Sequence, residues 1–312
     1  MREYSKIGDE KIQKMILHPL DAGGKRIRPC LTLLAAEAVG GDPESILPAA
    51  ASVELLHTFT LVHDDIMDHD EERRGKPTVH SIWGDEMGIM IGDTLYSSSF
   101  KALIDMRNKG VEDSRVLKAV EALVEANTEL QEGQIMDMLF EKDDQVTEDQ
   151  YMTMIGKKTG ALIEAAVKIG CIVGGGSEEQ LEAFRIYGSN CGVAFQIKDD
   201  VLDLTADAKK LGKPVGSDIR SGKKTLIIVH ALAKACEEDR DMIKAVLGND
   251  SASDEDVKAA IDKLGETGSI EYADERVAEL ISEGKRALGI LPDCEAKDSL
   301  IEIADFLIDR NM

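Results

Sequence analysis

The sequence twice places three aspartates in the pattern Asp-Asp-x-x-Asp, at residues 64–68 and again at residues 199–203. In a helix the outer aspartates of each copy lie one turn apart on one face. Like charges at this spacing destabilise a helix by roughly a few tenths of a kcal/mol, and placing them beside apolar residues costs more unless a cation compensates. The ligands are hard oxygens, and no nearby Cys or His completes a zinc site. The pattern therefore predicts Mg²⁺ binding.

Both acidic clusters follow apolar stretches, and in the second one Gln196 and Asp203 share a helix face with Asp199 or Asp200. Mg²⁺ keeps part of its water shell and often shares the rest with substrate phosphates. Two such clusters therefore favour a diphosphate held between them. One copy alone would be a weak signal, explained more readily by an acidic, solvated helix face, and this alternative stays open for each copy taken singly.

Basic residues gather in glycine-containing connections close to the acidic clusters. They are Lys25, Arg26 and Arg28; Arg73, Arg74 and Lys76; Lys157 and Lys158; and Lys213, Arg220, Lys223 and Lys224. Glycine lets a backbone approach a phosphate closely, and free amide groups at a helix start add to the attraction for anions. The alternative is simple charge pairing with acidic helices. We interpret the combination of glycine and cations as favouring phosphate binding.

Long helices must position these clusters. The chain has 312 residues, 43% hydrophobic but only 4% aromatic, and apolar residues recur at three and four positions between residues 26 and 235. No stretch alternates as a strand does, and we find no repeat or linker. The sequence therefore predicts an all-α, single-domain bundle over residues 1–312, with chemistry-bearing motifs in residues 23–225 and acidic helices in residues 236–312.

Charge and cysteine usage restrict the partners and the compartment. Acidic residues number 60 against 37 basic ones, a net charge of −23, which disfavours binding to nucleic acid or anionic lipid. The five cysteines are scattered without a CxxC pair, so a cytoplasmic location is the default expectation. Charges interrupt both the N-terminal stretch and the apolar stretch 161–173, so we expect neither a signal peptide nor stable membrane insertion.

The ordered motifs closely resemble those of the trans-isoprenyl diphosphate synthases, also called polyprenyl synthetases. The resemblance extends from Gly23 to about residue 235 through GGKRIRP, LLHTFTLVHDDIMDHDEERRGKPTVH, GD at 92–93, GQIMD, KKTG, FQIKDDVLD and GKPVGSDIRSGKKT. It implies an all-helical bundle around a deep central cavity, in a homodimer, with the two aspartate-rich motifs on opposing helices. The implied substrates are isopentenyl diphosphate and an allylic diphosphate.

By position, the resemblance also implies a role for each matching residue. The Mg²⁺ ligands would be Asp64, Asp68 and Asp199, binding three ions when the allylic diphosphate is present, while Asp65, Asp200 and Asp203 would act through water or as supporting residues. The isopentenyl diphosphate site would contain Lys25, Arg28, His57 and Arg74. The allylic diphosphate site would contain Arg73, Lys158, Lys213 and Lys223, with Thr159 and Gln196 near the reacting carbons.

Product length depends on the bulk of the side chains below the first acidic cluster. Phe59 precedes Asp64 by five residues, about 7.5 Å along a helix axis, and is our first candidate for the floor of the product cavity, followed by Thr60 and Leu56. An ordinary core phenylalanine is the alternative. A single aromatic residue here, with two residues inside the first aspartate motif, resembles archaeal-type geranylgeranyl diphosphate synthases. We therefore expect geranylgeranyl or farnesyl diphosphate as the product.

Other functions fit the motifs less well. A synthase of longer polyprenyl chains remains an alternative, although such enzymes tend to carry a small residue at position 59. A head-to-head condensing enzyme or terpene cyclase would lack the paired GGKRIRP and ERRGK motifs, and a regulatory subunit of a synthase would typically have lost one aspartate motif. An acidic scaffold or calcium buffer would leave the basic connections unexplained.

Overall fold

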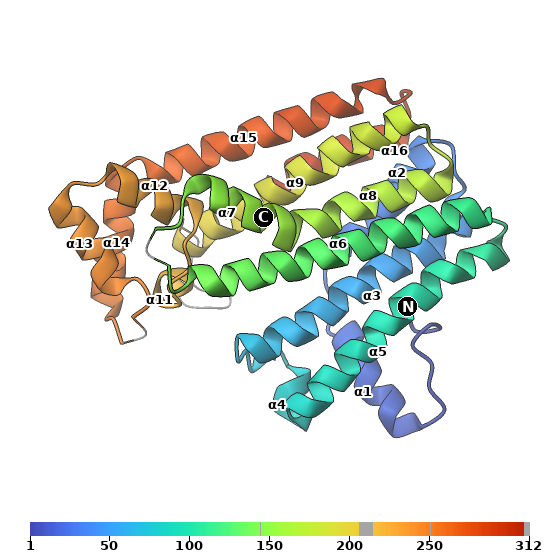
Figure 1. Ribbon diagram of the computed structural model, residues 1–312, viewed down its shortest axis with the longest axis horizontal. Coiled ribbons are helices and arrows are strands. Elements are labelled where there is room, and N and C mark those ends of the chain that lie inside the picture. The colour runs from blue at the N-terminus through green and yellow to red at the C-terminus, as the bar shows by residue number, and fades with distance from the viewer. Residues whose placement is uncertain (144, 206–214, 250, 309–312) are drawn as a thin grey trace. The chain divides into compact units, whose positions relative to one another are not determined.

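The computed structural model describes residues 1–143, 145–205, 215–249 and 251–308, and helices make up nearly all of its regular structure (Figure 1). The helices are α1 (Glu10–Asp21), α2 (Ile27–Ala38), α3 (Pro43–Met67), α4 (Val79–Trp83), α5 (Asp85–Ile104), η1 (Asp105–Lys109), α6 (Asp113–Phe140), α7 (Glu148–Ile155), η2 (Gly156–Gly160), α8 (Ala161–Gly174), α9 (Glu178–Thr205), α11 (Ser217–Arg220), α12 (Leu226–Lys234), α13 (Glu237–Val246), α14 (Asp254–Glu266), α15 (Ser269–Ala287), η3 (Leu288–Ile290) and α16 (Glu295–Ile308). Within these residues the only strands are β1 (Glu72–Arg73) and β2 (Lys76–Pro77), which pair antiparallel. The prediction of an all-helical protein is confirmed.

The chain forms two compact units. Unit 1 comprises Met1–Asn127, Leu162–Arg185 and Gly289–Leu300, and unit 2 comprises Thr128–Ala161, Ile186–Leu288 and the residues from Ile301 on. Some boundaries fall inside helices, including α6 and α9. The first acidic cluster therefore belongs to unit 1, and the second belongs to unit 2.

Helix α3 forms the core of unit 1 because its side chains are apolar on nearly every face. Asp42 caps its start by accepting hydrogen bonds from the backbone N–H groups of Glu44 and Ser45, at 3.2 and 3.3 Å, and Pro43 takes the first helical position, where no donor is lost. Helices α2 and α5 pack against it (Figure 1). By length and composition α3 could span a membrane, but 67% of its most apolar window is buried inside the protein, as in an ordinary core helix.

A tight hairpin follows α3 and turns the chain back toward it. Strands β1 and β2 are joined by Arg74 and Gly75, both with positive φ, at 56° and 70°. Positive φ at both central positions is the geometry of a two-residue hairpin turn, and glycine adopts it without strain whereas arginine does not. The hairpin thus places Arg73 and Arg74 beside the helix that carries the first acidic cluster.

In unit 2, helix α7 runs directly into one turn of π-helix, η2. A capping box starts α7: the Thr147 hydroxyl accepts from the backbone N–H of Gln150 at 3.3 Å, and the Gln150 side chain accepts from the backbone N–H of Thr147 at 2.8 Å. In η2, which holds the Gly-Lys-Lys-Thr-Gly motif, the backbone of Lys158 lies so close to Gly133 of α6 that a Cβ at Gly133 would overlap it. The glycine of the GQIMD motif therefore permits this close approach.

The acidic C-terminal quarter forms helices, and some of its acidic residues lie in the first turns of these helices. Helix α13 carries three acidic residues in its first turn, and so does α14, which Ser253 also caps by accepting a hydrogen bond from Asp256. Negative charge is stabilised at a helix start by the macrodipole. Much of this acidity therefore supports helix formation at the surface of unit 2.

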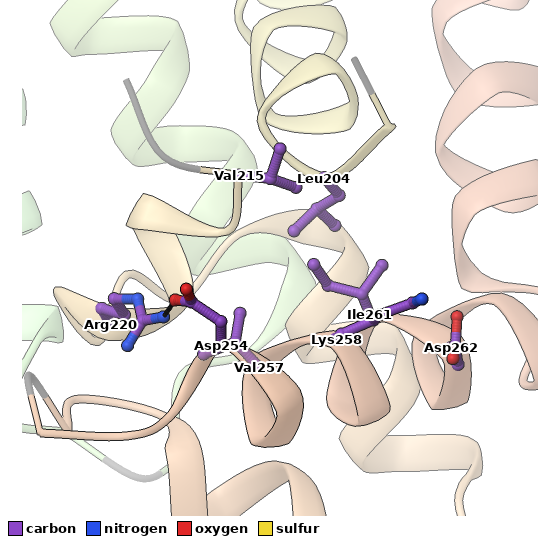
Figure 2. Close-up of a pocket in the computed structure, with 8 residues that line it drawn as sticks. All are labelled: Leu204, Val215, Arg220, Asp254, Val257, Lys258, Ile261 and Asp262. Carbon is purple, nitrogen blue, oxygen red and sulfur yellow. Dashed lines mark hydrogen bonds and ion pairs between the residues drawn. The ribbon is translucent and has the colours of Figure 1, made fainter. Parts of the chain in front are cut away.

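Helix α14 also lines a pocket of about 540 Å³ beside the end of α9. In Figure 2 the side chains of Leu204, Val215 and Ile261 point toward one another at its apolar part. At its edge Arg220 donates to Asp254 at 2.5 Å and to the Ala252 carbonyl. Arg220 is one of the basic residues considered for phosphate binding from the sequence. In the structure it links α11 to the start of α14.

Candidate active site

The first acidic cluster lies at the C-terminal end of α3, in unit 1. The backbone N–H of Asp68 donates to the carbonyl of Asp64 at 2.8 Å, so the two residues are one helical turn apart as predicted. Asp64 is half-buried and Asp68 is exposed. Asp65 differs from both because it is buried and accepts a hydrogen bond from Nε of Arg73. Burial raises the pKa of Asp65, while the charge of Arg73 opposes that rise.

A set of cations surrounds the start of α2 in the same unit. Nη1 of Arg74 donates to the Gly23 carbonyl, and the Arg74 guanidinium lies where a Cβ on Gly24 would be. Gly24 has a φ of 128°, which again favours glycine. Lys25 is exposed next to this contact. The hairpin and the GGKRIRP motif, about fifty residues apart in the sequence, therefore meet at one basic surface.

His57 lies among these cations and is held neutral by burial and by their charges. Nη1 of Arg28 donates to Nε2 of His57 at 3.3 Å, which places the imidazole proton on Nδ1. Burial lowers the pKa of His57 well below its usual value, and the charges of Arg28 and Arg74 lower it further. His57 therefore acts as a neutral hydrogen-bonding group near neutral pH.

The candidate floor residue Phe59 lies in a row of rings within unit 1. Its ring contacts His63 edge-on, with centroids 4.7 Å apart, and Tyr96 of α5 at 5.1 Å, while Tyr96 contacts Phe100 at 5.0 Å. The adjacent Thr60 is buried, and its hydroxyl donates to the His57 carbonyl at 2.9 Å. The sequence reasoning missed Tyr96, although its spacing of four residues from Phe100 was a usable signal.

The second acidic cluster lies on α9, in unit 2, and its three aspartates have different surroundings. Asp199 is half-buried, whereas Asp200 and Asp203 are buried. Asp200 accepts a hydrogen bond from the Tyr151 hydroxyl at 2.5 Å and another from Nε2 of Gln196 at 3.0 Å. Burial and then the charge of Asp218 raise the pKa of Asp200 to about 7.

Asp203 anchors the segment that follows the second cluster. Its carboxylate accepts from the Ser217 hydroxyl at 2.7 Å and from the backbone N–H of Asp218 at 3.1 Å. It thereby fixes the start of α11, ahead of the connection that contains Lys223. Nζ of Lys223 lies 3.8 Å from an oxygen of Asp218. Lys213 lies outside the described residues.

Polar side chains of η2 and α9 form a connected chain in unit 2. The Thr159 hydroxyl donates to Gln196 at 2.8 Å, and Gln196 in turn donates to Asp200. Nζ of Lys158 donates to Asp137 at 2.6 Å. A pocket of about 50 Å³ borders this chain, lined among others by Asp137, Tyr151, Lys158, Gln196, Asp200 and Lys223.

Two residues of this pocket were missed by the sequence reasoning. Asp137 is the last residue of the GQIMD motif, a motif that carries the family resemblance but that gave no individual residue a role. Tyr151 gave no signal, because a tyrosine within a helical stretch is an ordinary core residue. Its fully buried hydroxyl has a pKa raised well above the usual value, mainly by burial, so it remains a hydrogen-bond donor to Asp200.

The acidic residues fit a metal that shares its shell with a substrate. Among the described residues, no three His, Cys, Asp or Glu side chains are grouped so that they could hold an ion by themselves. Asp64 and Asp68, however, present hard oxygens one turn apart at a solvent-accessible helix end. Mg²⁺ is commonly held by one or two carboxylates, waters and substrate phosphates. This donor set therefore suits Mg²⁺ together with a phosphorylated ligand.

Comparisons with known proteins agree with this chemistry. A family model described as polyprenyl synthetase matches residues 9–264. The chain is 46% identical to a short chain isoprenyl diphosphate synthase of Methanothermobacter thermautotrophicus, over 99% of this chain and 97% of the relative. It is 40% identical to a geranylfarnesyl diphosphate synthase of Aeropyrum pernix, over 99% and 97%. Its structure matches a geranylgeranyl pyrophosphate synthetase from Pyrococcus horikoshii with a TM-score of 0.93 and 47% identity, over 99% and 93% of the two chains.

Proposed function

Because the chain belongs to the polyprenyl synthetase family, we propose that it is a trans-prenyltransferase that joins isopentenyl diphosphate head-to-tail to allylic diphosphates of five to fifteen carbons. The observation that carries this assignment is the basic surface of unit 1, where Arg74 contacts the GGKRIRP loop and Arg28 contacts His57. A cyclase or head-to-head enzyme, which needs no isopentenyl diphosphate site, would not require this second set of cations.

In the proposed reaction, the residues of unit 1 bind the nucleophilic substrate. Lys25, Arg28 and Arg74 neutralise the diphosphate of isopentenyl diphosphate. His57 contributes a neutral hydrogen-bonding group, because burial and then the neighbouring cations make its protonation unfavourable. Arg73 of the same unit is assigned instead to the allylic diphosphate, and it also donates to Asp65, so that its charge lies beside the first acidic cluster.

The residues of unit 2 act on the allylic substrate. Lys158, with Lys213 and Lys223, attracts the diphosphate as its bond to carbon breaks and negative charge develops on the leaving oxygen. Thr159 and Gln196 direct oxygen dipoles toward the allylic carbocation, and their hydrogen bond to each other holds both in place. The double bond of isopentenyl diphosphate then attacks the cation. A proton is lost to the departing diphosphate, which restores a double bond in the product.

Members of this family generally use Mg²⁺. In our proposal Asp64, Asp68 and Asp199 hold three ions when the allylic diphosphate is bound. When bound, the ions would neutralise part of the charge that develops on the leaving diphosphate. Asp65, Asp200 and Asp203 are engaged by protein donors and support the neighbouring residues instead.

We propose geranylgeranyl diphosphate, with or without farnesyl diphosphate, as the product. The support is Phe59, which is only 8% exposed and is packed between His63 and Tyr96 below the first acidic cluster. A longer product remains the second candidate, because similar relatives include a geranylfarnesyl diphosphate synthase. A regulatory subunit is disfavoured because both aspartate motifs are complete.

The remaining assignments are also proposals. We propose that the catalytic protein is a homodimer, because α5 and α6 expose large apolar side chains, including Met90 and Leu117, each 60% exposed. We propose that the two units act as one catalytic domain, with a cytoplasmic location and no nucleic-acid partner.

One assay tests the proposed activity. The protein is incubated with Mg²⁺, labelled isopentenyl diphosphate and each allylic primer from five to fifteen carbons, and the dephosphorylated products are sized by chromatography. We expect condensation that stops at fifteen to twenty carbons and is abolished by a chelator. If no primer is extended, the enzyme assignment is wrong; products of twenty-five carbons or more would favour the longer-chain alternative.

A further inference from the structure

Arg26, between the phosphate-site candidates Lys25 and Arg28, has an unusual backbone conformation. Its φ is 55° and its ψ is 35°, in the left-handed region, and it is the N-cap of α2. Gly23 and Gly24 also have positive φ, so three of the four residues from 23 to 26 adopt such angles. Glycine does so freely, whereas arginine does so at a cost and only where surrounding contacts enforce it. Some contact must therefore hold Arg26 in place.

The side chain of Arg26 supplies that contact. Nη1 forms an ion pair with Oε1 of Glu54, and Nη2 donates to the Leu20 carbonyl at 2.7 Å. Glu54 lies in the middle of α3 with only 4% of its side chain exposed, whereas Leu20 lies near the end of α1. Arg26 therefore joins α1, the start of α2 and the core helix α3 at one point. Its guanidinium is turned into the protein.

Glu54 and His57 are three residues apart on α3, so they share a face of the helix. On this face Glu54 forms the ion pair with Arg26, and His57 accepts the 3.3 Å hydrogen bond from Arg28. On its other side the loop is held by Arg74, which donates to the Gly23 carbonyl. The loop is thus fixed at both ends, and Glu54 is the buried carboxylate within a cluster of cations.

The charges of Arg26, Arg74 and Glu54 also indicate that the ion pair holds the loop in place. Burial and the charge of Arg26 lower the pKa of the Arg74 guanidinium, and the charge of Glu54 opposes this. Without Glu54, mutual repulsion among the cations would favour opening the loop. With Glu54 present, the basic residues remain close together before any anion is bound. The entropy lost in ordering the loop on binding is therefore smaller.

We propose that the Arg26–Glu54 ion pair is a positioning device for the isopentenyl diphosphate site: it holds the loop so that Lys25 and Arg28 are preorganised for the diphosphate, and neither member of the pair contacts the substrate. This inference rests on the function proposed above. In this proposal Lys25 and Arg28 contact the diphosphate, whereas Arg26 acts only by positioning these two residues.

The test is a double-mutant cycle in which the Michaelis constant for each substrate is measured. Arg26→Met, Glu54→Met and the double variant are assayed with each substrate varied in turn, and circular dichroism records helix content. Each single variant is expected to raise KM for isopentenyl diphosphate at least about tenfold, the effect of losing a charge-assisted hydrogen bond, while KM for the allylic diphosphate changes less than about threefold. Because the two residues act as one unit, the double variant should show about the same increase as either single variant.

Two matched variants complete the design. Glu54→Gln keeps an oxygen that accepts from Arg26 but removes the negative charge, so its KM for isopentenyl diphosphate should lie between those of the wild type and Glu54→Met. Arg107→Met removes an exposed arginine of unit 1 that pairs with Asp113 at 2.8 and 2.9 Å, far from the loop in sequence, and should leave both Michaelis constants unchanged.

Several outcomes would overturn the proposal. Additive effects in the cycle, or an effect of Arg26→Met without one of Glu54→Met, would mean that Arg26 binds the substrate directly. Equal increases in both Michaelis constants would indicate a general structural role, and so would loss of helix content in all three variants. If the wild-type protein extends no primer, the proposed function itself is wrong; an active wild type with unaffected variants refutes only the positioning role.

Discussion

Replacing Phe59 by alanine is expected to lengthen the product. Phe59 is about 7.5 Å along the α3 axis from Asp64, and its ring closes the space between His63 and Tyr96. Leu56 and Leu55, both fully buried, are the next large side chains on this face, about 4.5 to 6 Å further along. Removing the ring therefore opens the depth of about one helical turn, room for roughly one more five-carbon unit.

The same substitution should also destabilise the protein. Phe59 is only 8% exposed, and truncation of a buried phenylalanine to alanine typically costs about 3–5 kcal/mol of unfolding free energy. Stability and product length must therefore be measured on the same samples. Urea denaturation gives the first quantity, and chromatography of the dephosphorylated products gives the second.

Leu61→Ala provides the control, because Leu61 lies two residues further on, on nearly the opposite face of α3, and lines a different small cavity with Thr58 and Asp65. It should weaken folding without changing product length. The floor role of Phe59 is refuted if Phe59→Ala leaves the distribution between fifteen and twenty carbons unchanged, or if Leu61→Ala lengthens the product equally.

Three further predictions concern the two clusters and their neighbours. Tyr151→Phe removes the 2.5 Å hydrogen bond to buried Asp200 and should lower the unfolding free energy by about 1–3 kcal/mol; an unchanged urea midpoint would show that the bond contributes nothing. Folding lowers the pKa of His57, so below about pH 6.5 the unfolded chain binds a proton that the folded protein does not, and stability falls as pH falls. His57→Gln should therefore make stability measurably less dependent on pH between 7 and 5, and identical profiles for variant and wild type would contradict this. Asp64→Ala and Asp199→Ala should each reduce turnover by orders of magnitude with helix content retained, whereas near-normal rates would remove them from the proposed metal site.

Local sequence patterns were sufficient for the helices and for the chemical character of the motifs. Apolar periodicity and few aromatic residues predicted long helices, and the structure has them, as in α3, which begins at Pro43 after the Asp42 cap. The aspartate spacing placed Asp64 and Asp68 one turn apart, and the structure has them so. These features depend on neighbours within a few residues, which the sequence displays directly.

The pairings between distant segments were not visible in the sequence. Tyr151 and Asp200 are 49 residues apart, and Arg26 and Glu54 are 28 residues apart, yet each pair meets in a buried contact. The sequence contains many other aspartates, glutamates and arginines, and several of each stay at the surface. Which of them becomes a partner depends on how helices pack.

The sequence by itself therefore determined the helical class, the family and the chemical identity of the candidate ligands, because spacing along a helix fixes which side chains share a face. The tertiary structure alone decided that Asp65 and Asp200 are engaged by protein donors while Asp64 and Asp199 are not buried, and that Arg26 is turned inward between Lys25 and Arg28. The physical reason is burial. Desolvation makes an unpaired buried charge costly, so packing selects which charged side chains are buried beside protein donors and which stay accessible to solvent.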